Sequence, residues 1–380
     1  MTDTGGLRLV RLVARDFRNH ADLDLAVGAR VVALVGENGA GKTNLLEAIS
    51  LFSPGRGLRR ADLSAMPRVG GPGGFAVSVA LGGESEHRLG TGYEPPGHDG
   101  RASRVCRIDG APASSPVAFA EHLRVVWLTP DLDGLFRGPA GDRRRFLDRL
   151  VLAVDAAHGQ RVSAMERALR SRNRLLEERA GDGQWLDAVE REVAELGVAV
   201  ALARRETVER LDRLIGETRD EAAPFPWAAV RLEGDLDDLV AVWPAIEAED
   251  RFRLALKQGR PRDRAAGRTL VGPQTTDLVV RHGPKDVPAA TASTGEQKAL
   301  LVGLVLAHAR LVQAMSGIAP LILLDEVAAH LDPRRRAGLF EALEALPGQV
   351  WMTGADEALF AELAGRADVV RVAEGRIVPP

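Results

Sequence analysis

Residues 31–43 read Val-Val-Ala-Leu-Val-Gly-Glu-Asn-Gly-Ala-Gly-Lys-Thr, and this stretch decides the fold. The five apolar residues Val31–Val35 are typical of a strand buried on both faces of a sheet. The next eight, Gly36–Thr43, satisfy the pattern G-x-x-x-x-G-K-[ST], and Thr43–Leu51 has the apolar spacing of a helix. Strand, loop and helix in this order predict a phosphate-binding loop in an α/β domain. The alternative is a glycine-rich turn that binds nothing.

The loop predicts ATP and Mg²⁺ as cofactors. Backbone N–H groups of a glycine-rich loop curl around phosphate oxygens, and the helix N-terminus adds partial positive charge. Lys42 is expected to reach the β- and γ-phosphates, and the Thr43 hydroxyl is expected to bind Mg²⁺. The nucleotide-binding residues that we expect are Gly36, Glu37, Asn38, Gly39, Ala40, Gly41, Lys42, Thr43 and Asn44.

A second aliphatic run, Leu321–Leu324, ends in Asp325 and Glu326. A buried parallel strand would deliver Asp325 to the carboxyl edge of the sheet beside the phosphate loop, where its carboxylate can hold Mg²⁺. Glu326 is then expected to orient and activate the attacking water. We therefore predict Glu326, Lys42 and Asp325 as catalytic residues and Thr43 and Asp325 as metal ligands. The alternative is a strand followed by an acidic helix start.

The segment Ser293–Lys298 precedes the apolar stretch Ala299–Val312 and forms a second possible anion site at a helix N-terminus. One triphosphate rarely needs two such sites. A two-fold dimer is the economical solution, in which this segment of one copy caps the γ-phosphate held by the other. The residues that we expect to act across the interface are Ser293, Gly295, Gln297 and Asp332, with His330 beside them. The alternative is an ordinary serine helix cap.

The order of elements predicts one α/β domain that a helical insertion divides. Short strands and turns fill the first third of the chain, and strand patterns return after Arg268. Between them, Asp142–Glu221 has the apolar spacing of long helices. We expect a nucleotide-binding domain made of residues 1–135 and 266–380, and an inserted helical lobe made of residues 136–265.

Composition narrows the function classes. The net charge is −3 over 380 residues, so any nucleic-acid contact must be a local patch. Cys106 is the single cysteine, and the first ten residues lack the apolar core of a signal peptide. The stretch Ala299–Val312 is too short to span a bilayer. These features favour a cytoplasmic protein without a membrane partner.

The motifs in their order resemble the ABC-type heads of SMC-like ATPases, and within that group the RecF family. The specific matches are Phe17–His20, Asn44–Ile49, Arg144–Asp148, Arg172–Leu176 and Asp325–Val327 with Leu331–Asp332. The resemblance covers most of the chain. It implies an ABC-type P-loop NTPase head that is formed by the N- and C-terminal segments around the helical lobe.

The resemblance also implies a function. Members of the family are slow, Mg-dependent, DNA-stimulated ATPases that dimerise on DNA with ATP and release it on hydrolysis. They act in recombinational repair, in replication restart at gaps and in the SOS response to DNA damage, as mediators that load a recombinase. Implied partners are gapped or double-stranded DNA with a single-strand junction, a second copy of the chain, and a RecR-type mediator.

Arginines supply the candidate DNA contacts. Related heads use an arginine after the phosphate-loop helix near phosphate or DNA, which indicates Arg59. Three dense clusters, Arg143–Arg145, Arg167–Arg174 and Arg334–Arg336, either meet DNA phosphates or lie on solvated faces paired with acids. Two other functions stay open: an ABC-transporter-type ATPase subunit, and an ATP-binding DNA scaffold with negligible turnover.

Overall fold

The computed structural model describes residues 7–83, 86–97, 102–178, 183–220, 223–328 and 331–378. The chain divides into two compact units. Unit 1 contains residues 1–133, 220–226 and 293–380, and unit 2 contains residues 134–219 and 227–292. Residues 266–292, which we assigned to the nucleotide-binding domain, cluster with unit 2. The domain boundaries that we drew from the sequence stay a prediction.

The first sheet of unit 1 is parallel apart from one edge strand, and it runs in the order β15-β14-β3-β13-β12-β8. Its strands are β3 (Val31–Val35), β8 (Val125–Leu128), β12 (Leu321–Leu324), β13 (Val350–Gly354), β14 (Ala367–Ala373) and β15 (Arg376–Val378). Every residue of β3, β8, β12 and β13 is buried. Among these strands, β3 and β12 are unbroken aliphatic runs, as expected for strands of a parallel sheet that are buried on both faces.

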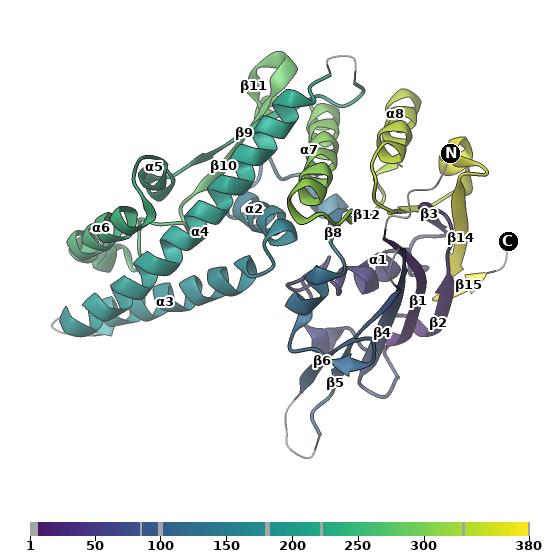
Figure 1. The fold of residues 1–380 in the computed structure, drawn as a ribbon, viewed down its shortest axis with the longest axis horizontal. Coiled ribbons are helices and arrows are strands. Elements are labelled where there is room, and N and C mark those ends of the chain that lie inside the picture. Colours follow the sequence, from purple (N-terminus) through teal and green to yellow (C-terminus); the bar gives the residue numbers. More distant parts are fainter. Residues whose placement is uncertain are drawn as a thin grey trace. The chain divides into compact units, whose positions relative to one another are not determined.

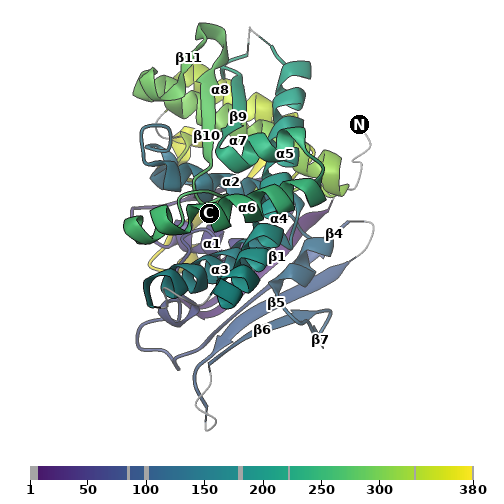
Figure 2. The ribbon, with the colours of Figure 1, turned by 90° about the vertical axis from the view of Figure 1, so that its left-hand side faces the viewer.

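The second sheet of unit 1 is antiparallel, with the order β2-β1-β4-β5-β6-β7 (Figure 2). Its strands are β1 (Arg8–Phe17), β2 (His20–Ala26), β4 (Phe75–Gly82), β5 (His87–Glu94), β6 (Ser103–Ile108) and β7 (Ala111–Pro112). Burial alternates along β2 and β4, so one face of each strand meets the core. Helix α1 (Lys42–Ser50) shares one hydrophobic cluster with residues of both sheets.

Unit 1 also contains α7 (Thr294–Ser316) and α8 (Pro333–Glu344). Helix α7 has 23 residues and an 18-residue window of mean hydropathy 1.6, so by length and composition it is long enough to cross a membrane. The helix is longer than the apolar stretch Ala299–Val312, on which we based the prediction that it is too short to span a bilayer. However, 67% of that window is buried inside the structure, as in the core helix of a globular domain.

Unit 2 is mainly helical. Its helices are α2 (Ala140–Val154), α3 (His158–Glu178), α4 (Gly183–Glu217), α5 (Asp235–Val242) and α6 (Ala245–Ala266). Figure 1 shows α3 and α4 running side by side. A small antiparallel sheet of β11 (Val287–Pro288), β10 (Asp277–His282) and β9 (Ala228–Glu233) completes the unit.

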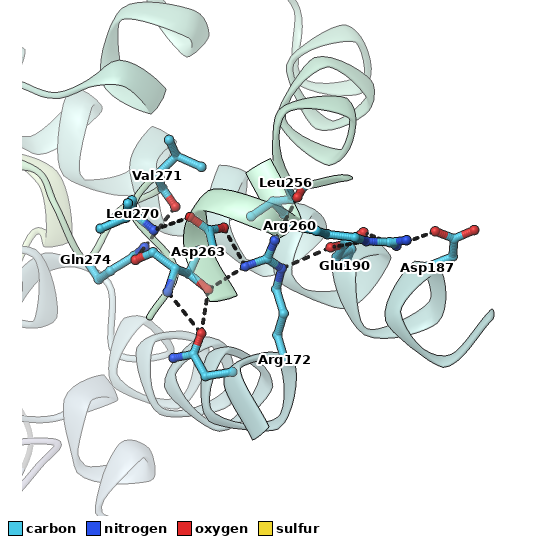
Figure 3. A network of polar contacts seen from close by, with 11 residues as sticks. Arg172, Asp187, Glu190, Leu256, Arg260, Asp263, Leu270, Val271 and Gln274 are labelled. Atoms are coloured by element: carbon cyan, nitrogen blue, oxygen red, sulfur yellow. Dashed lines mark hydrogen bonds and ion pairs between the residues drawn. The ribbon is translucent and has the colours of Figure 1, made fainter. Parts of the chain in front are cut away.

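A buried arginine links three helices of unit 2 (Figure 3). Arg172 of α3 is completely buried, and its Nε lies 3.0 Å from Glu190 of α4. Its Nη1 donates to Asp263 of α6 at 2.8 Å and to the Thr269 hydroxyl at 2.7 Å. The buried Arg172 guanidinium is thus paired with two buried carboxylates, and their opposite charges compensate its burial. This corrects the sequence interpretation, because Arg172 of the second arginine cluster cannot meet DNA.

We predict that Arg172→Met lowers the free energy of unfolding by about 3 kcal/mol, because it leaves the buried Asp263 without its arginine and leaves Glu190 with Arg260 alone. The measurement is urea denaturation followed by circular dichroism. Arg174→Met, on the exposed side of the same helix, is the matched control and should change stability by less than about 0.5 kcal/mol. Equal stability of the two variants would contradict the structural role of Arg172.

Candidate nucleotide site

The phosphate loop lies between β3 and α1, where the sequence predicts it. Gly41 caps α1 at φ 114°, and a Cβ atom there would lie 2.7 Å from the Asn19 side chain. Gly36 has φ 154°, and a Cβ atom there would lie 2.1 Å from the carbonyl oxygen of Val372. The backbone conformation and the close neighbours both require glycine at these two positions.

Lys42 is buried at the start of α1. Its Nζ donates to the carbonyl oxygens of Gly36 at 2.5 Å and Glu37 at 2.8 Å, so the side chain spans the loop that it belongs to. Burial lowers the pKa of the Lys42 ammonium, and Glu326 and Asp325 partly oppose this shift. The acidic strand end therefore lies close enough to act on Lys42 electrostatically.

Asp325 and Thr43, which are 282 residues apart in the chain, meet at the carboxyl edge of the parallel sheet. The Thr43 hydroxyl donates to Asp325 Oδ1 at 2.9 Å. The Thr353 hydroxyl, at the end of β13, donates to the same oxygen at 2.8 Å. Burial raises the pKa of the Asp325 carboxyl; the two hydroxyls lower it, and Glu326 raises it further. A hydroxyl beside a buried carboxylate is a donor set that suits Mg²⁺.

Glu326 has a left-handed backbone, with φ 53°. Its backbone N–H donates to the Thr353 hydroxyl oxygen at 2.8 Å. Thr353 therefore fixes both acidic residues, one through its carboxylate and the other through its backbone. A left-handed conformation is strained for a residue with a side chain, and such strain is concentrated at functional sites.

Asn19, in the turn between β1 and β2, and His20, at the start of β2, contact the backbone of the phosphate loop. Asn19 Nδ2 donates to the carbonyl oxygen of Ala40 at 3.1 Å, and Asn44 Nδ2 donates to Asn19 Oδ1 at 2.7 Å. The completely buried His20 ring lies between the carbonyl oxygens of Gly41, 3.2 Å from Nε2, and Gly375, 2.7 Å from Nδ1. Burial lowers the pKa of His20. These contacts hold the loop without occupying the groups that face a phosphate.

Arg59 follows α1 in the chain and its side chain lies against Asn44 and Glu47 of that helix. Its Nη1 donates to Glu47 Oε2 at 2.9 Å and to Asn44 Oδ1 at 2.6 Å. The completely buried Glu47 also binds Arg18, through Nε at 2.8 Å and Nη2 at 2.6 Å. The side chain of Arg59 is 41% exposed, so it is anchored at the loop and still accessible.

The second expected anion site is also at a helix N-terminus. Ser293 caps α7: its hydroxyl donates to Glu296 Oε2 at 2.9 Å, and the backbone N–H of Glu296 donates back at 3.4 Å. Gly295 is exposed, whereas Gln297 is buried. The exposed Asp332 caps α8 by accepting from the backbone N–H of Arg335 at 2.9 Å. His330 lies outside the described residues.

The structure brings Ser293, Gly295 and Asp332 together, because Arg335 connects them. Arg335 Nη1 donates to the Gly295 carbonyl oxygen at 3.5 Å, and its Nε lies 3.7 Å from Asp332. The hydrogen bonds of Ser293 and Gly295 run to Glu296 and Arg335, not to the phosphate loop of their own chain.

The arginine clusters separate into paired and unpaired residues. In the first cluster, Arg143 binds Asp277, Arg144 binds the Thr276 carbonyl oxygen and Arg145 binds Asp142, so this cluster stabilises unit 2. In the second, Arg167, Arg170 and Arg174 are exposed and follow helical spacing along one face of α3. Within the part of the chain that the structure describes, these three make no ion pair.

Three residues at the site were not assigned from the sequence. Thr353 lies where no motif marks it, and only the order of strands reveals its contact with Asp325. Asn19 lies within Phe17–His20, a segment that the family resemblance indicated without giving it a role. Glu47 looks like an ordinary helical surface residue, and its burial comes from the packing of α1 between the sheets.

Known families and solved structures show which class of fold this protein has. Residues 159–355 match the family model described as "AAA domain, putative AbiEii toxin, Type IV TA system". The fold resembles a solved structure of the recombination mediator protein RecF with ATPrS in the RecFOR pathway, with a TM-score of 0.84 at 20% identity over 99% of both chains. It also resembles an SmcHead bound to the C-winged helix domain of ScpA, with a TM-score of 0.52 at 17% identity over 97% of both chains. The fold is an ABC-type P-loop ATPase head.

Sequence relatives identify the family. The chain is 54% identical to the DNA replication and repair protein RecF of Rhizobium meliloti (strain 1021), over 97% of this chain and 98% of the relative. It is 52% identical to the protein of the same name from Brucella abortus (strain 2308), over 99% and 96%. The chain belongs to the RecF family, as its motifs predict.

We predict that Asp325→Asn raises the thermal unfolding temperature of the nucleotide-free protein. The variant keeps the size of the side chain and removes a buried charge beside Glu326, which should stabilise the fold by on the order of 1 kcal/mol. The raised pKa means that ionisation of Asp325 costs folding free energy above that pKa, and costs nothing below the ordinary value of 3.8.

The gain should therefore be larger at neutral pH than in mild acid. Differential scanning fluorimetry at both pH values is the measurement, and Asp356→Asn, at an exposed helix cap, is the control. A lower unfolding temperature for Asp325→Asn at neutral pH would show that the carboxylate stabilises the free protein.

Proposed function

We propose that the chain is an ATP-dependent DNA-binding ATPase that dimerises on DNA, hydrolyses ATP to release it, and acts in recombinational repair and replication restart at gaps. The observation that carries this proposal is the contact between the Thr43 hydroxyl and Asp325 Oδ1 at 2.9 Å. It joins the phosphate loop to the acidic strand end, as binding and hydrolysis of a triphosphate both require.

Mg²⁺ fits this site. Thr43 and Asp325 would hold it, and it would supply positive charge that neutralises the negative charge of the phosphates. The protein residues do the rest: the backbone of Gly36–Gly41 orients the phosphates, and Lys42 turns from the loop carbonyls to the β- and γ-phosphates. Thr353 keeps Asp325 and Glu326 in place, and the Glu326 carboxylate orients the attacking water and accepts its proton.

Two features support a site shared between two copies. Ser293 and Gly295 lie at the exposed N-terminus of α7, and in their own chain they bind Glu296 and Arg335 rather than the phosphate loop. A two-fold axis would place Ser293 and Gly295 of each copy opposite the phosphate loop of the other, so that the dimer has two such sites. ATP held between the copies then acts as the contact that keeps the dimer closed, and hydrolysis opens it.

DNA as the ligand is supported by the names of the relatives and by the face of α3. Arg167, Arg170 and Arg174 are exposed and free of ion pairs to described residues, so they suit the phosphate backbone of DNA. Aromatic residues make up 4% of the chain, which favours backbone contacts over base stacking. The preferred DNA would be double-stranded with a single-strand junction. A RecR-type mediator is the further partner that the family implies.

We predict that Lys42→Met weakens ATP binding by about 100-fold and removes the ATP dependence of DNA binding, because the lost ammonium pairs with the phosphates. The measurements are calorimetric titration with ATP and fluorescence anisotropy with gapped DNA, each with and without ATP. Lys257→Met, on the exposed side of unit 2, is the control. Undiminished ATP-dependent DNA binding in Lys42→Met would refute the coupling.

We also predict that Ser293→Arg abolishes ATP-dependent dimerisation and leaves ATP binding by the single chain unchanged. The larger side chain would obstruct the γ-phosphate presented by the other copy, while the loop that binds ATP stays intact. Light scattering with ATP is the measurement. Ser103→Arg, at an exposed position on β6, is the matched control and should dimerise normally. An undisturbed dimer in Ser293→Arg would contradict the shared site.

A further inference from the structure

A cavity of about 750 Å³ adjoins the phosphate loop in unit 1. One wall is the first half of the loop, Gly36–Ala40. The other walls are the loop after β13 and the end of β14 with its turn into β15, which contribute Ala355–Glu357, Arg371–Glu374 and Val378. The cavity therefore shares the phosphate loop as one of its walls.

The cavity is acidic. Its lining includes four carboxylates, from Glu37, Asp356, Glu357 and Glu374, against the single guanidinium of Arg371. The Glu357 carboxylate forms an ion pair with Arg371, with 2.7 Å between Oε2 and Nη2. The carboxylates of Glu37 and Glu374 make no hydrogen bond or ion pair with any residue that the structure describes. An excess of unpaired negative charge disfavours a phosphate in the cavity and favours a cationic group.

A cationic group is available on the same chain, at a place that faces a second copy. Arg334, Arg335 and Arg336 lie in the first turn of α8, which begins at Pro333 after the capping residue Asp332. Arg334 is exposed and makes no ion pair with a described residue. Cations are unfavourable in the first turn of a helix because of the helix dipole. Arg335 and Arg336 lie near the acids Asp332 and Glu362, whereas Arg334 has no such compensation among the described residues.

Arg335 fixes this turn beside the segment that caps the second nucleotide. Its Nη1 lies 3.5 Å from the Gly295 carbonyl oxygen, so the first turn of α8 lies next to the N-terminus of α7. If Gly295 lies over the phosphate loop of another copy, the turn of α8 arrives at the same loop. The cavity beside Glu37 is the acidic surface on that loop.

We propose that the first turn of α8 docks into the cavity of the second copy, with Arg334 paired to Glu374 and, on the loop itself, to Glu37. This inference rests on the proposed ATP-dependent dimer and names the surface that holds it. The two-fold axis makes the contact twice, so each substitution changes two contacts. In this proposal Arg334 binds a second copy of the chain and not DNA.

The experiment is a charge exchange. The dimer dissociation constant is measured by sedimentation with a non-hydrolysable ATP analogue, for the wild type, Arg334→Glu, Glu374→Arg and the double variant. Each single variant should raise the constant by about 10-fold or more, and the double variant should recover to within about 3-fold of the wild type, since opposite charges face each other again. Glu121→Arg, at an exposed site of unit 1 outside the cavity, is the control and should have no effect.

The outcomes separate this inference from the proposed function. If the wild type does not dimerise with the analogue, the proposed function itself fails. If the wild type dimerises and the single variants match it, or the double variant is no better than either, the docking contact is refuted. The cavity has a different occupant if Glu374→Arg changes the ATP affinity of the monomeric Ser293→Arg protein, because that result makes it part of the nucleotide site.

Discussion

The hydrogen bond between Thr43 and Asp325 is the constraint on which the rest of the structure depends. It closes a chain segment of 282 residues, and it is possible only because β3 and β12 are parallel strands in one sheet with β13 between them. Parallel order brings the carboxyl ends of all three strands to one edge. Thr353 of β13 then reaches Asp325 and Glu326 at once, so three distant segments form one site.

Some charged side chains of this protein form buried ion pairs, and others are exposed without a partner of opposite charge. In unit 2, Arg172 is buried with Glu190 and Asp263, where it fixes the packing of three helices and has no access to a ligand. In unit 1, Glu47 is buried and holds Arg18 and Arg59 at the end of the phosphate-loop helix. Exposed arginines that lack acidic partners among the described residues include Arg167, Arg170 and Arg174 on α3, and Arg334 at the start of α8. Burial separates the arginines that stabilise the fold from those that are accessible to a ligand, and the amino-acid composition does not show which are buried.

Much of the site was predictable from the sequence, because its motifs are local. The strands Val31–Val35 and Leu321–Leu324 are where their aliphatic runs predict, and the phosphate loop follows from glycine spacing. The contacts of Thr353, Asn19 and Glu47 were not predictable, since each depends on a strand order or a packing contact that joins distant segments. Strand β9 (Ala228–Glu233) was also missed, because it lies within residues 136–265, which we predicted to be helical. The burial of Arg172 was missed because its two acidic partners lie on other helices.

The central claim is that each nucleotide site is completed by a second copy, and mixing two inactive variants tests it most directly. Glu326→Gln keeps the capping segment and loses the catalytic carboxylate, whereas Ser293→Ala keeps the carboxylate and loses the capping hydroxyl. A mixed dimer contains one site with both intact groups. ATP hydrolysis by the mixture should therefore exceed the sum of the two variants measured separately. A rate equal to that sum would contradict the account and would mean that each chain completes its own site.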